Sequence, residues 1–287
     1  MSTPELSRSR AAVESSGAVL DVRESTGSTN ADLLQAASGL PDGSVVATLD
    51  QTAGRGRLDR SWTAPTGQTL AASVLVRADL TDRDRGWLPL VAGAAMRDAV
   101  RAALEPAPDD RADGADASRA SRPADTEARG TERVLVKWPN DVLVDGRKVC
   151  GILCQVAGDG AVVVGAGVNL TIPADALPTP NATSLVAAGA TGDAAGLADA
   201  VLSVFVTGVR EAVVALATGG ADADAVRSHV RAVCGTIGAR VRLELPDGGV
   251  VEADATGIDD DGRITIRDRD GVSRGVAVGD VTHLRYA

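Results

Sequence analysis

Residues 133–156, RVLVKWPNDVLVDGRKVCGILCQV, decide the fold class because short apolar runs alternate with residues that form turns. RVLVKW (133–138) predicts one strand. VLVDGRKVCGILCQV (142–156) predicts a hairpin, since its Asp145-Gly146 pair favours the two-residue turns that join antiparallel strands. We therefore expect consecutive strands of one sheet in this part of the chain.

Strand and helix periodicity continues on both sides of this stretch. Apolar patterns predict further strands at SVVATLD (44–50), TLAASVLVR (69–77) and AVVVGAGVNL (161–170). Apolar residues at helical spacing predict helices at 86–104, 194–216 and 223–233. From Thr236 onward, short strands alternate with turns and suggest a small β-barrel of SH3-like size. The sequence thus predicts an α/β domain followed by a compact β domain.

The domain boundaries follow from composition. Residues 1–17 are polar and small, and predict a flexible N-terminal arm. Residues 18–234 form the predicted α/β domain, and residues 235–287 the C-terminal β domain. Within the first of these, residues 105–133 contain no Val, Leu, Ile, Met or aromatic side chain, so they cannot bury enough apolar surface to order themselves. We interpret them as a disordered insertion.

Composition excludes several classes of protein. The formal net charge of −10 argues against a general nucleic-acid binder, which usually carries a basic domain. The three cysteines lack the paired pattern of a disulfide scaffold or zinc site, and we interpret them as reduced thiols. No apolar run reaches the roughly 20 residues of a membrane span, and the N-terminus lacks the apolar core of a signal peptide. We expect a soluble, cytoplasmic protein with no membrane or DNA partner.

DQTAGRGRLDRSW (50–62) is the clearest candidate for a binding loop. Gly54 and Gly56 flank Arg55 and precede Arg57, and Arg60 follows three residues later. Guanidinium groups make bidentate contacts with phosphate or carboxylate. The loop lacks the spacing of a P-loop, so it predicts another kind of anion site. Trp62 offers a flat face on which a ring can stack. The simpler alternative is a solvated turn.

Three further stretches contain candidate site residues. STN (28–30) can cap a helix and leave its first N–H groups free, although on its own the motif is better explained by a plain helix cap. KWPND (137–141) puts an ammonium, an amide and a carboxylate at the end of a strand, with an edge lysine as the simpler alternative. GAGVN (165–169) has two glycines inside a strand, which usually means that a ligand or another backbone passes close by.

The order and spacing of these motifs resemble the biotin protein ligase family. The resemblance rests on STN, Q-x-x-GRGR-x-x-R-x-W, KWPND followed by GRKVCGIL, GxGxNL and the C-terminal GDVxHLR, and it runs from about Asp21 to Arg285 apart from the insertion. It is to the monofunctional form, since fewer than thirty residues precede STN and leave no room for a winged-helix DNA-binding domain. Asp59 departs from the family, which commonly has glycine there, and puts the binding strength of the loop in doubt.

The resemblance implies a fold and a reaction. The fold is a central mixed sheet like that of class II aminoacyl-tRNA synthetases, with a C-terminal SH3-like barrel. The substrates are biotin and ATP with Mg²⁺, and they give biotinyl-5′-adenylate. A lysine of the biotin carboxyl carrier domain of acyl-CoA carboxylases then receives the biotinyl group. The chain would be a monomer or a weak, ligand-dependent homodimer.

The resemblance also implies roles for individual residues. Lys137 would bridge the biotin carboxylate and the α-phosphate, and Arg57 would act with it in catalysis from a mobile loop. Biotin contacts fall to Ser28, Thr29, Asn30, Gln51, Arg55, Gly56, Arg57, Lys137 and Gly151. Nucleotide contacts fall to Arg55, Arg57, Trp62, Asn140, Asp141 and Asn169, and no residue is assigned as a metal ligand.

Two alternatives share part of this pattern. A lipoate-type ligase would have the same fold and the same adenylation chemistry, but it is not expected to carry GRGRxxRxW together with KWPND. A biotin-sensing transcriptional regulator would be a binding protein and would need a DNA-binding surface, which we do not find in the sequence.

Overall fold

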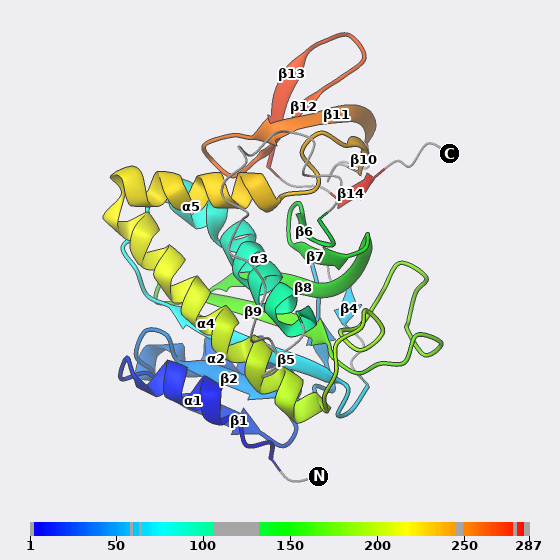
Figure 1. Cartoon of the computed structure of the whole chain (residues 1–287). Helices are drawn as coiled ribbons and strands as arrows, with labels where there is room; N and C mark the ends of the chain where they lie inside the picture. Colours follow the sequence, from blue (N-terminus) through cyan, green and yellow to red (C-terminus); the bar gives the residue numbers. More distant parts are fainter. Residues whose placement is uncertain are drawn as a thin grey trace, which may run out of the picture.

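A seven-stranded sheet organises the larger unit of the chain, and a smaller antiparallel sheet packs at one end of it (Figure 1). The computed structural model describes residues 3–57, 60–62, 65–105, 132–244, 249–277 and 280–283. Asp59 and most of the predicted insertion, residues 106–131, lie outside the described residues.

The large sheet is mixed, as predicted. Its strands, in spatial order, are β1 (Leu20–Arg23), β2 (Val45–Thr48), β5 (Thr69–Val76), β9 (Val162–Asn169), β8 (Arg147–Val156), β7 (Asp141–Val144) and β6 (Val134–Lys137). β1 and β2 are parallel, and every other neighbouring pair is antiparallel. The β7–β8 hairpin turns at Asp145 and Gly146, whose φ angles of 49° and 75° are those of the predicted turn.

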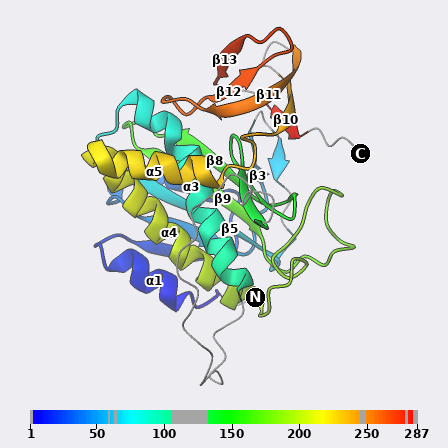
Figure 2. The ribbon, with the colours of Figure 1, turned by 45° about the horizontal axis from the view of Figure 1, so that its top comes forward.

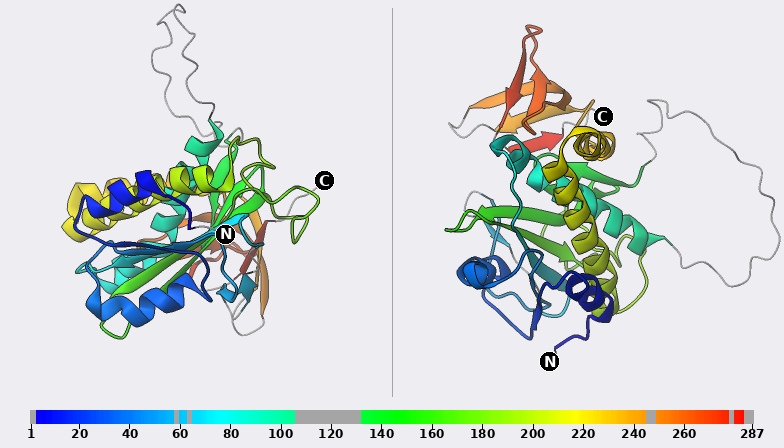
Figure 3. Two further views of the ribbon diagram at one scale, coloured as in Figure 1. Left: turned by 90° about the horizontal axis from the view of Figure 1, so that it is seen from below. Right: turned by 90° about the vertical axis from the view of Figure 1, so that its left-hand side faces the viewer.

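Helices cover both faces of this sheet (Figure 3). On one face lie α1 (Ser7–Glu14), α3 (Asp82–Leu104), α4 (Ala194–Thr218) and α5 (Gly220–Val233). On the other face lies α2 (Thr29–Ala36), whose Leu33 packs with Val46, Leu75 and Val163 in a separate small core. Strand alternation explains the two cores, because successive side chains point to opposite faces. The N-terminus of α2 therefore reaches the end of the sheet from the side that carries fewer helices.

The N-terminal arm is not loose, and the prediction for residues 7–14 was wrong. They form α1, and Leu6 and Val13 are almost completely buried against the rest of the fold. Asp199 of α4 accepts hydrogen bonds from the Arg8 and Ser9 N–H groups at 3.0 and 2.8 Å, so a carboxylate occupies the positive end of the α1 dipole. These contacts are non-local, which is why the polar composition of the arm concealed the helix.

α4 is the helix among the described residues that is long and apolar enough to cross a membrane, with a mean hydropathy of 1.8 in its most apolar window. Its Leu202, Phe205 and Val206 are fully buried and belong to the main core. α4 also contacts α1, α3 and α5. This packing is that of a core helix.

The C-terminal unit is a five-stranded antiparallel sheet, visible at the top of Figure 2. Its spatial order is β13 (Ser273–Val276), β12 (Ile264–Arg267), β11 (Val250–Ile258), β10 (Arg240–Glu244) and β14 (Asp280–His283). The predicted small β domain is confirmed. β13 and β14 lie at the two ends of this order and do not pair with each other among the described residues, so closure into an SH3-like barrel stays a prediction.

The turn between β11 and β12 fastens the small unit to the large one. The indole of Trp87 donates to the Asp260 carbonyl at 2.8 Å, and that of Trp138 donates to the Gly262 carbonyl at 3.1 Å. The Arg231 guanidinium stacks 4.9 Å above the Trp87 ring. Since Trp138 directly precedes the Pro-Asn-Asp turn of the catalytic domain, the C-terminal unit holds the neighbourhood of that turn.

Candidate active site

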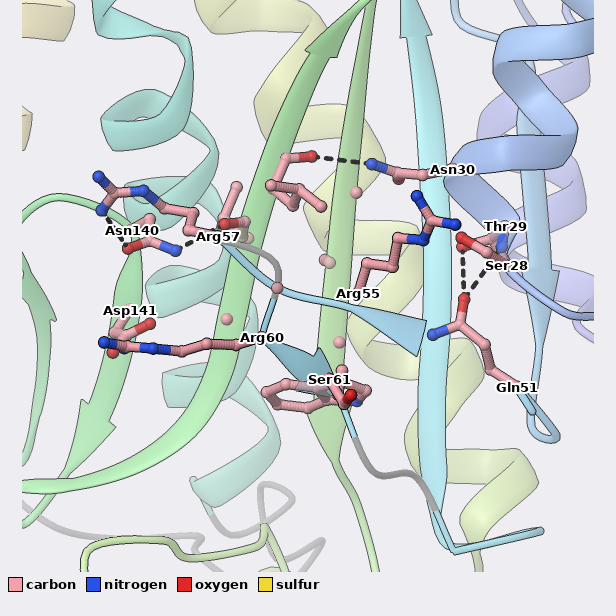
Figure 4. A pocket seen from close by; sticks show the side chains of 18 of the residues that line it. Ser28, Thr29, Asn30, Gln51, Arg55, Arg57, Arg60, Ser61, Asn140 and Asp141 are labelled. Carbon is pink, nitrogen blue, oxygen red and sulfur yellow. Dashed lines mark hydrogen bonds between the residues drawn. The ribbon is translucent and has the colours of Figure 1, made fainter. Parts of the chain in front are cut away.

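A cavity of about 170 Å³ lies between the N-terminus of α2, a small hairpin and strands β7 to β9. The hairpin consists of β3 (Gly54–Arg55) and β4 (Ser61–Trp62) and carries the arginine loop across the sheet (Figure 4). The lining residues are Ser28, Thr29, Asn30, Gln51, Arg55, Gly56, Arg57, Arg60, Ser61, Trp62, Asn140, Asp141, Lys148, Gly151, Ile152, Leu153, Gly165, Ala166 and Gly167. Eleven of the thirteen candidate residues from the sequence are in this set, and Lys137 and Asn169 are not.

Ser28 and Gln51 shape the end of the cavity next to α2. Ser28 is the predicted helix cap, and its hydroxyl accepts from the Ala31 N–H. Thr29 donates its backbone N–H to Gln51 Oε1 at 3.0 Å. A parallel bridge between Thr26 and Gln51 sets this pairing. The contact uses the amide oxygen of Gln51, so its nitrogen remains as a donor toward the cavity.

The glycines of β8 and β9 leave space that side chains from other segments of the protein occupy. A Cβ at Gly165 would lie 2.0 Å from Asn30 Oδ1, and one at Gly167 would lie 2.7 Å from the Trp62 ring. A Cβ at Gly151 would approach Trp62 to 3.3 Å. The sequence predicted a close approach by a ligand or another backbone at the GAG stretch. The structure shows that Asn30 and Trp62 make this approach and form the floor of the cavity.

The arginines of the hairpin point in different directions. Gly56 donates its N–H to the Arg60 carbonyl at 2.7 Å and closes the hairpin. Arg57 donates to Asn140 Oδ1 at 3.2 Å, whereas Arg60 extends toward Asp141 and Arg55 toward α2 (Figure 4). Whether the loop is mobile without ligand stays a prediction.

Lys148 is the lysine of this cavity, and the sequence interpretation missed it. Its Nζ lies 2.6 Å from Asp141 Oδ1 and 5.6 Å from the centroid of the Trp62 ring. Lys137 pairs with Asp141 through the backbone of the edge strand β6, but it does not line the cavity. The structure thus brings Lys148 to the place that the sequence interpretation assigned to Lys137.

A β-bulge explains why Lys148 faces the cavity. Cys150 pairs with Val142, but Lys148 pairs with Leu143, so Val149 is the extra residue of β8. Val149 and Cys150 both point into the core and are fully buried. A regular strand would put Lys148 on the same face as Cys150, and the bulge moves it to the opposite face. Only its position between Gly146 and Gly151, in GRKVCG, could have drawn attention to it.

Asn140 and Asn169 serve different parts of the structure. Asn140 donates to the Ile152 carbonyl at 2.7 Å and accepts from Arg57, which fixes it at the cavity wall. Asn169 is buried at the end of β9 and donates to the Thr183 carbonyl at 2.8 Å. In this structure Asn169 therefore holds the segment that follows the sheet.

Charge is unevenly distributed over the lining residues. The described lining residues include three arginines and Lys148 but one carboxylate, that of Asp141. The thiols offer no nucleophile, because burial raises the pKa of Cys150 and Cys154 and keeps both neutral. Among the described residues, no group of three His, Cys, Asp or Glu side chains could hold a metal ion. The cavity is suited to binding anions beside a neutral polar end.

Comparison with known proteins gives consistent matches. The Biotin/lipoate A/B protein ligase family matches residues 20–170, and the Biotin protein ligase C terminal domain matches residues 236–284. A Mycobacterium tuberculosis protein named biotin–[acetyl-CoA-carboxylase] ligase is 40% identical over 93% of this chain and 89% of its own length.

Solved structures agree on the fold. A biotin protein ligase from Aquifex aeolicus, in complex with biotin and ATP, superposes with a TM-score of 0.65 at 21% identity and covers 93% of this chain and 98% of its own. A biotin protein ligase from Leishmania major, in complex with biotinyl-5-AMP, gives a TM-score of 0.55 at 24% identity over 90% and 97% of the two chains. At this level of identity the likeness concerns the fold alone.

Proposed function

The chain belongs to the biotin/lipoate A/B protein ligase family, and we propose that the cavity beside α2 joins biotin and ATP into biotinyl-5′-adenylate. The protein is a biotin protein ligase, an enzyme that uses ATP to attach biotin to a protein.

The excess of cations in the cavity is the observation that supports the proposal most strongly. Adenylation brings a carboxylate against a phosphate, so two negatively charged groups must be held together. Arg55, Arg57, Arg60 and Lys148 line the cavity, and Asp141 is the one carboxylate among the described lining residues. Such a surplus of fixed positive charge stabilises the charge that develops in the transition state. A solvated turn would not require such an excess of positively charged side chains.

We assign the bridging role to Lys148. Its ammonium stands between the Asp141 carboxylate and the Trp62 ring, on the floor of the cavity. From there it can contact the biotin carboxylate and the α-phosphate oxygens together. The oxygen of the biotin carboxylate attacks the α-phosphorus, the bond to the β-phosphate breaks, and pyrophosphate leaves.

The neutral end of the cavity matches the ureido ring of biotin, which has two N–H donors and one carbonyl acceptor. Ser28 and Thr29 offer hydroxyl oxygens, and Gln51 offers its amide nitrogen. The dithiolane ring of lipoate would leave these polar groups without partners, and buried polar groups without partners cost affinity. This chemistry favours biotin over lipoate.

Mg²⁺ enters the proposal only as the counterion of ATP. The described lining residues include one carboxylate, and Lys148 pairs with it at 2.6 Å, so they do not form a protein-held magnesium site.

In the second step, a lysine amine of a carrier domain attacks the acyl carbon of the adenylate. An amide forms, the bond between the acyl carbon and the phosphate oxygen breaks, and AMP leaves with the shared electron pair. The name of the mycobacterial relative supports a carboxylase carrier domain as the acceptor.

The test is a direct assay of the whole chain. The protein is incubated with biotin, ATP, Mg²⁺ and a purified biotin carboxyl carrier domain, and the carrier is examined by intact-protein and peptide mass spectrometry. We expect the biotinyl mass on one lysine, and none when that lysine is replaced by arginine or when lipoate replaces biotin. Modification by lipoate but not by biotin would overturn the assignment.

A further inference from the structure

Two side chains outside the cavity lining are hydrogen-bonded to the residues at its α2 end. Ser73 of β5 is completely buried, and its Oγ lies 2.8 Å from Thr29 Oγ1 and 2.6 Å from Asn30 Oδ1. Gln155 of β8 accepts from Asn30 Nδ2 at 2.8 Å, and the Leu153 carbonyl accepts from the same nitrogen at 3.1 Å. Ser73 and Gln155 therefore connect two strands of the sheet to the start of α2.

The chemistry of these groups fixes where each proton lies. Both protons of the Asn30 amide nitrogen are used by two carbonyl oxygens, those of Leu153 and Gln155. Asn30 Oδ1 then faces Ser73, and an amide oxygen only accepts, so the Ser73 hydroxyl donates to it. A hydroxyl has one proton. Ser73 Oγ can therefore only accept in its second contact, and the Thr29 hydroxyl must donate to it.

The Thr29 hydroxyl is consequently left as an acceptor toward the cavity. Its distance to Gln51 Oε1 is 3.3 Å, longer than the 2.8 Å to Ser73, so Ser73 takes the proton. Thr29 lines the cavity, and only its lone pairs remain for a ligand. The Asn30 amide donates both of its protons to protein groups. Asn30 therefore belongs to a hydrogen-bonded network with Thr29, Ser73 and Gln155, although the sequence interpretation assigned it to biotin contact.

We propose that Ser73 is a positioning residue, supported by Asn30 and Gln155, which makes the Thr29 hydroxyl an acceptor and thereby selects a ligand with an N–H donor at that point. The ligand named here, the ureido ring of biotin, rests on the proposed function. The direction of the hydrogen bonds rests on the contacts alone.

The strand β5 also supplies a matched control. Thr69 is as buried as Ser73, but its hydroxyl has no hydrogen-bond partner in the described structure. Thr69→Val removes a buried hydroxyl from the same strand without touching the network. A loss of biotin affinity in Ser73→Ala that is absent from Thr69→Val is therefore due to the network.

The experiment measures biotin binding by calorimetry and the KM values for biotin and ATP in the adenylation assay. Ser73→Ala should raise the Kd and KM for biotin about tenfold, the effect of one hydrogen bond to a ligand, and leave the KM for ATP unchanged. Because Ser73 acts through Thr29, the double variant Thr29→Val/Ser73→Ala should bind biotin no more weakly than Thr29→Val alone. A merely structural role would give additive losses.

Each other outcome overturns a defined claim. Additive losses in the double variant, or equal increases in the KM for biotin and ATP, would overturn the role of Ser73. If Ser73→Ala does not fold, Gln155→Met at a partly exposed position should still weaken biotin binding several-fold, and unchanged binding there would count against the network. Failure of the wild-type protein to bind biotin would overturn the proposed function as well.

Discussion

Replacing Lys148 by glutamine tests the assignment of the bridging lysine, with Lys137→Gln as its matched control. Both changes remove one positive charge and keep a side chain of similar length. Lys148 lies on the cavity floor, 2.6 Å from Asp141, whereas Lys137 stands on the edge strand and does not line the cavity. The sequence interpretation expected the opposite, with Lys137 as the catalytic residue.

The structure sets the size of both effects. The Lys148–Asp141 pair is partly solvated, with 36% and 19% of the two side chains exposed, so its loss should change the unfolding free energy by less than about 1 kcal/mol. In the transition state, by contrast, a positioned charge is worth about 2.7–4 kcal/mol, or about 10²–10³ in rate. Lys148→Gln should therefore remain folded and lose nearly all adenylation.

Pyrophosphate release with biotin and ATP, but without carrier, isolates the first step. We expect the rate of Lys148→Gln to fall by about 10²–10³ and that of Lys137→Gln by less than about threefold, with melting temperatures near that of the wild type. If Lys137→Gln loses the rate while Lys148→Gln keeps it, the assignment from the cavity is wrong and the sequence interpretation is right.

Three further changes probe the floor, the domain junction and the pH response. Gly167→Ala puts a Cβ 2.7 Å from the Trp62 ring and should weaken biotin binding at least tenfold by calorimetry, because Trp62 must move. Arg231→Met removes a charged hydrogen bond and a stacking contact at the C-terminal turn, and should lower the unfolding free energy by about 1.5–3 kcal/mol in urea. Burial raises the pKa of Asp84, but hydrogen bonds from a neighbouring threonine and Arg227 outweigh it and leave the pKa below 3.8. Its carboxylate therefore stabilises the fold above pH 3.8. The loss of unfolding free energy in Asp84→Asn should be complete at pH 7 and should become smaller as the pH falls below 3.8.

Each of these changes has its own control. Gly158→Ala adds a methyl group where nothing lies within 4 Å, and it should leave biotin binding unchanged. A wild-type affinity in Gly167→Ala would show that Trp62 is not part of the floor. Arg269→Met removes an exposed cation of the small domain, and an equal loss of stability there would show that Arg231 is not special. If the loss of unfolding free energy in Asp84→Asn does not depend on pH, the ionised Asp84–Arg227 pair is not its cause.

The sequence predicted those features that depend on neighbouring residues. The Asp145-Gly146 turn and the Ser28 cap are local, since each needs only a few residues of known conformational preference. The strand and helix patterns likewise follow from side-chain periodicity, and the motifs brought eleven candidate residues to one cavity.

The missed features depend on contacts between distant parts of the chain. The face that Lys148 occupies is set by a bulge opposite Val142 and Leu143, and no local signal shows which residue a strand will leave unpaired. α1 is stable because Asp199, far along the chain, accepts from its first N–H groups. In the sequence, Ser73 is only a residue within an apolar strand. Its role depends on hydrogen bonds to Thr29 and Asn30, which the fold brings next to it.

The two ends of the cavity are stabilised by different means, and this difference bears on its order of filling. Glycine inside a strand costs about 0.5–1 kcal/mol relative to alanine, and Gly165 and Gly167 both lie in β9. The close packing of Asn30 against Gly165 and of Trp62 against Gly167 offsets this cost. At the cationic end, the described lining residues include Lys148 and three arginines but one carboxylate, that of Asp141. We therefore expect biotin to meet the closely packed polar end of the cavity, and the phosphates of the nucleotide to add negative charge beside the arginine hairpin.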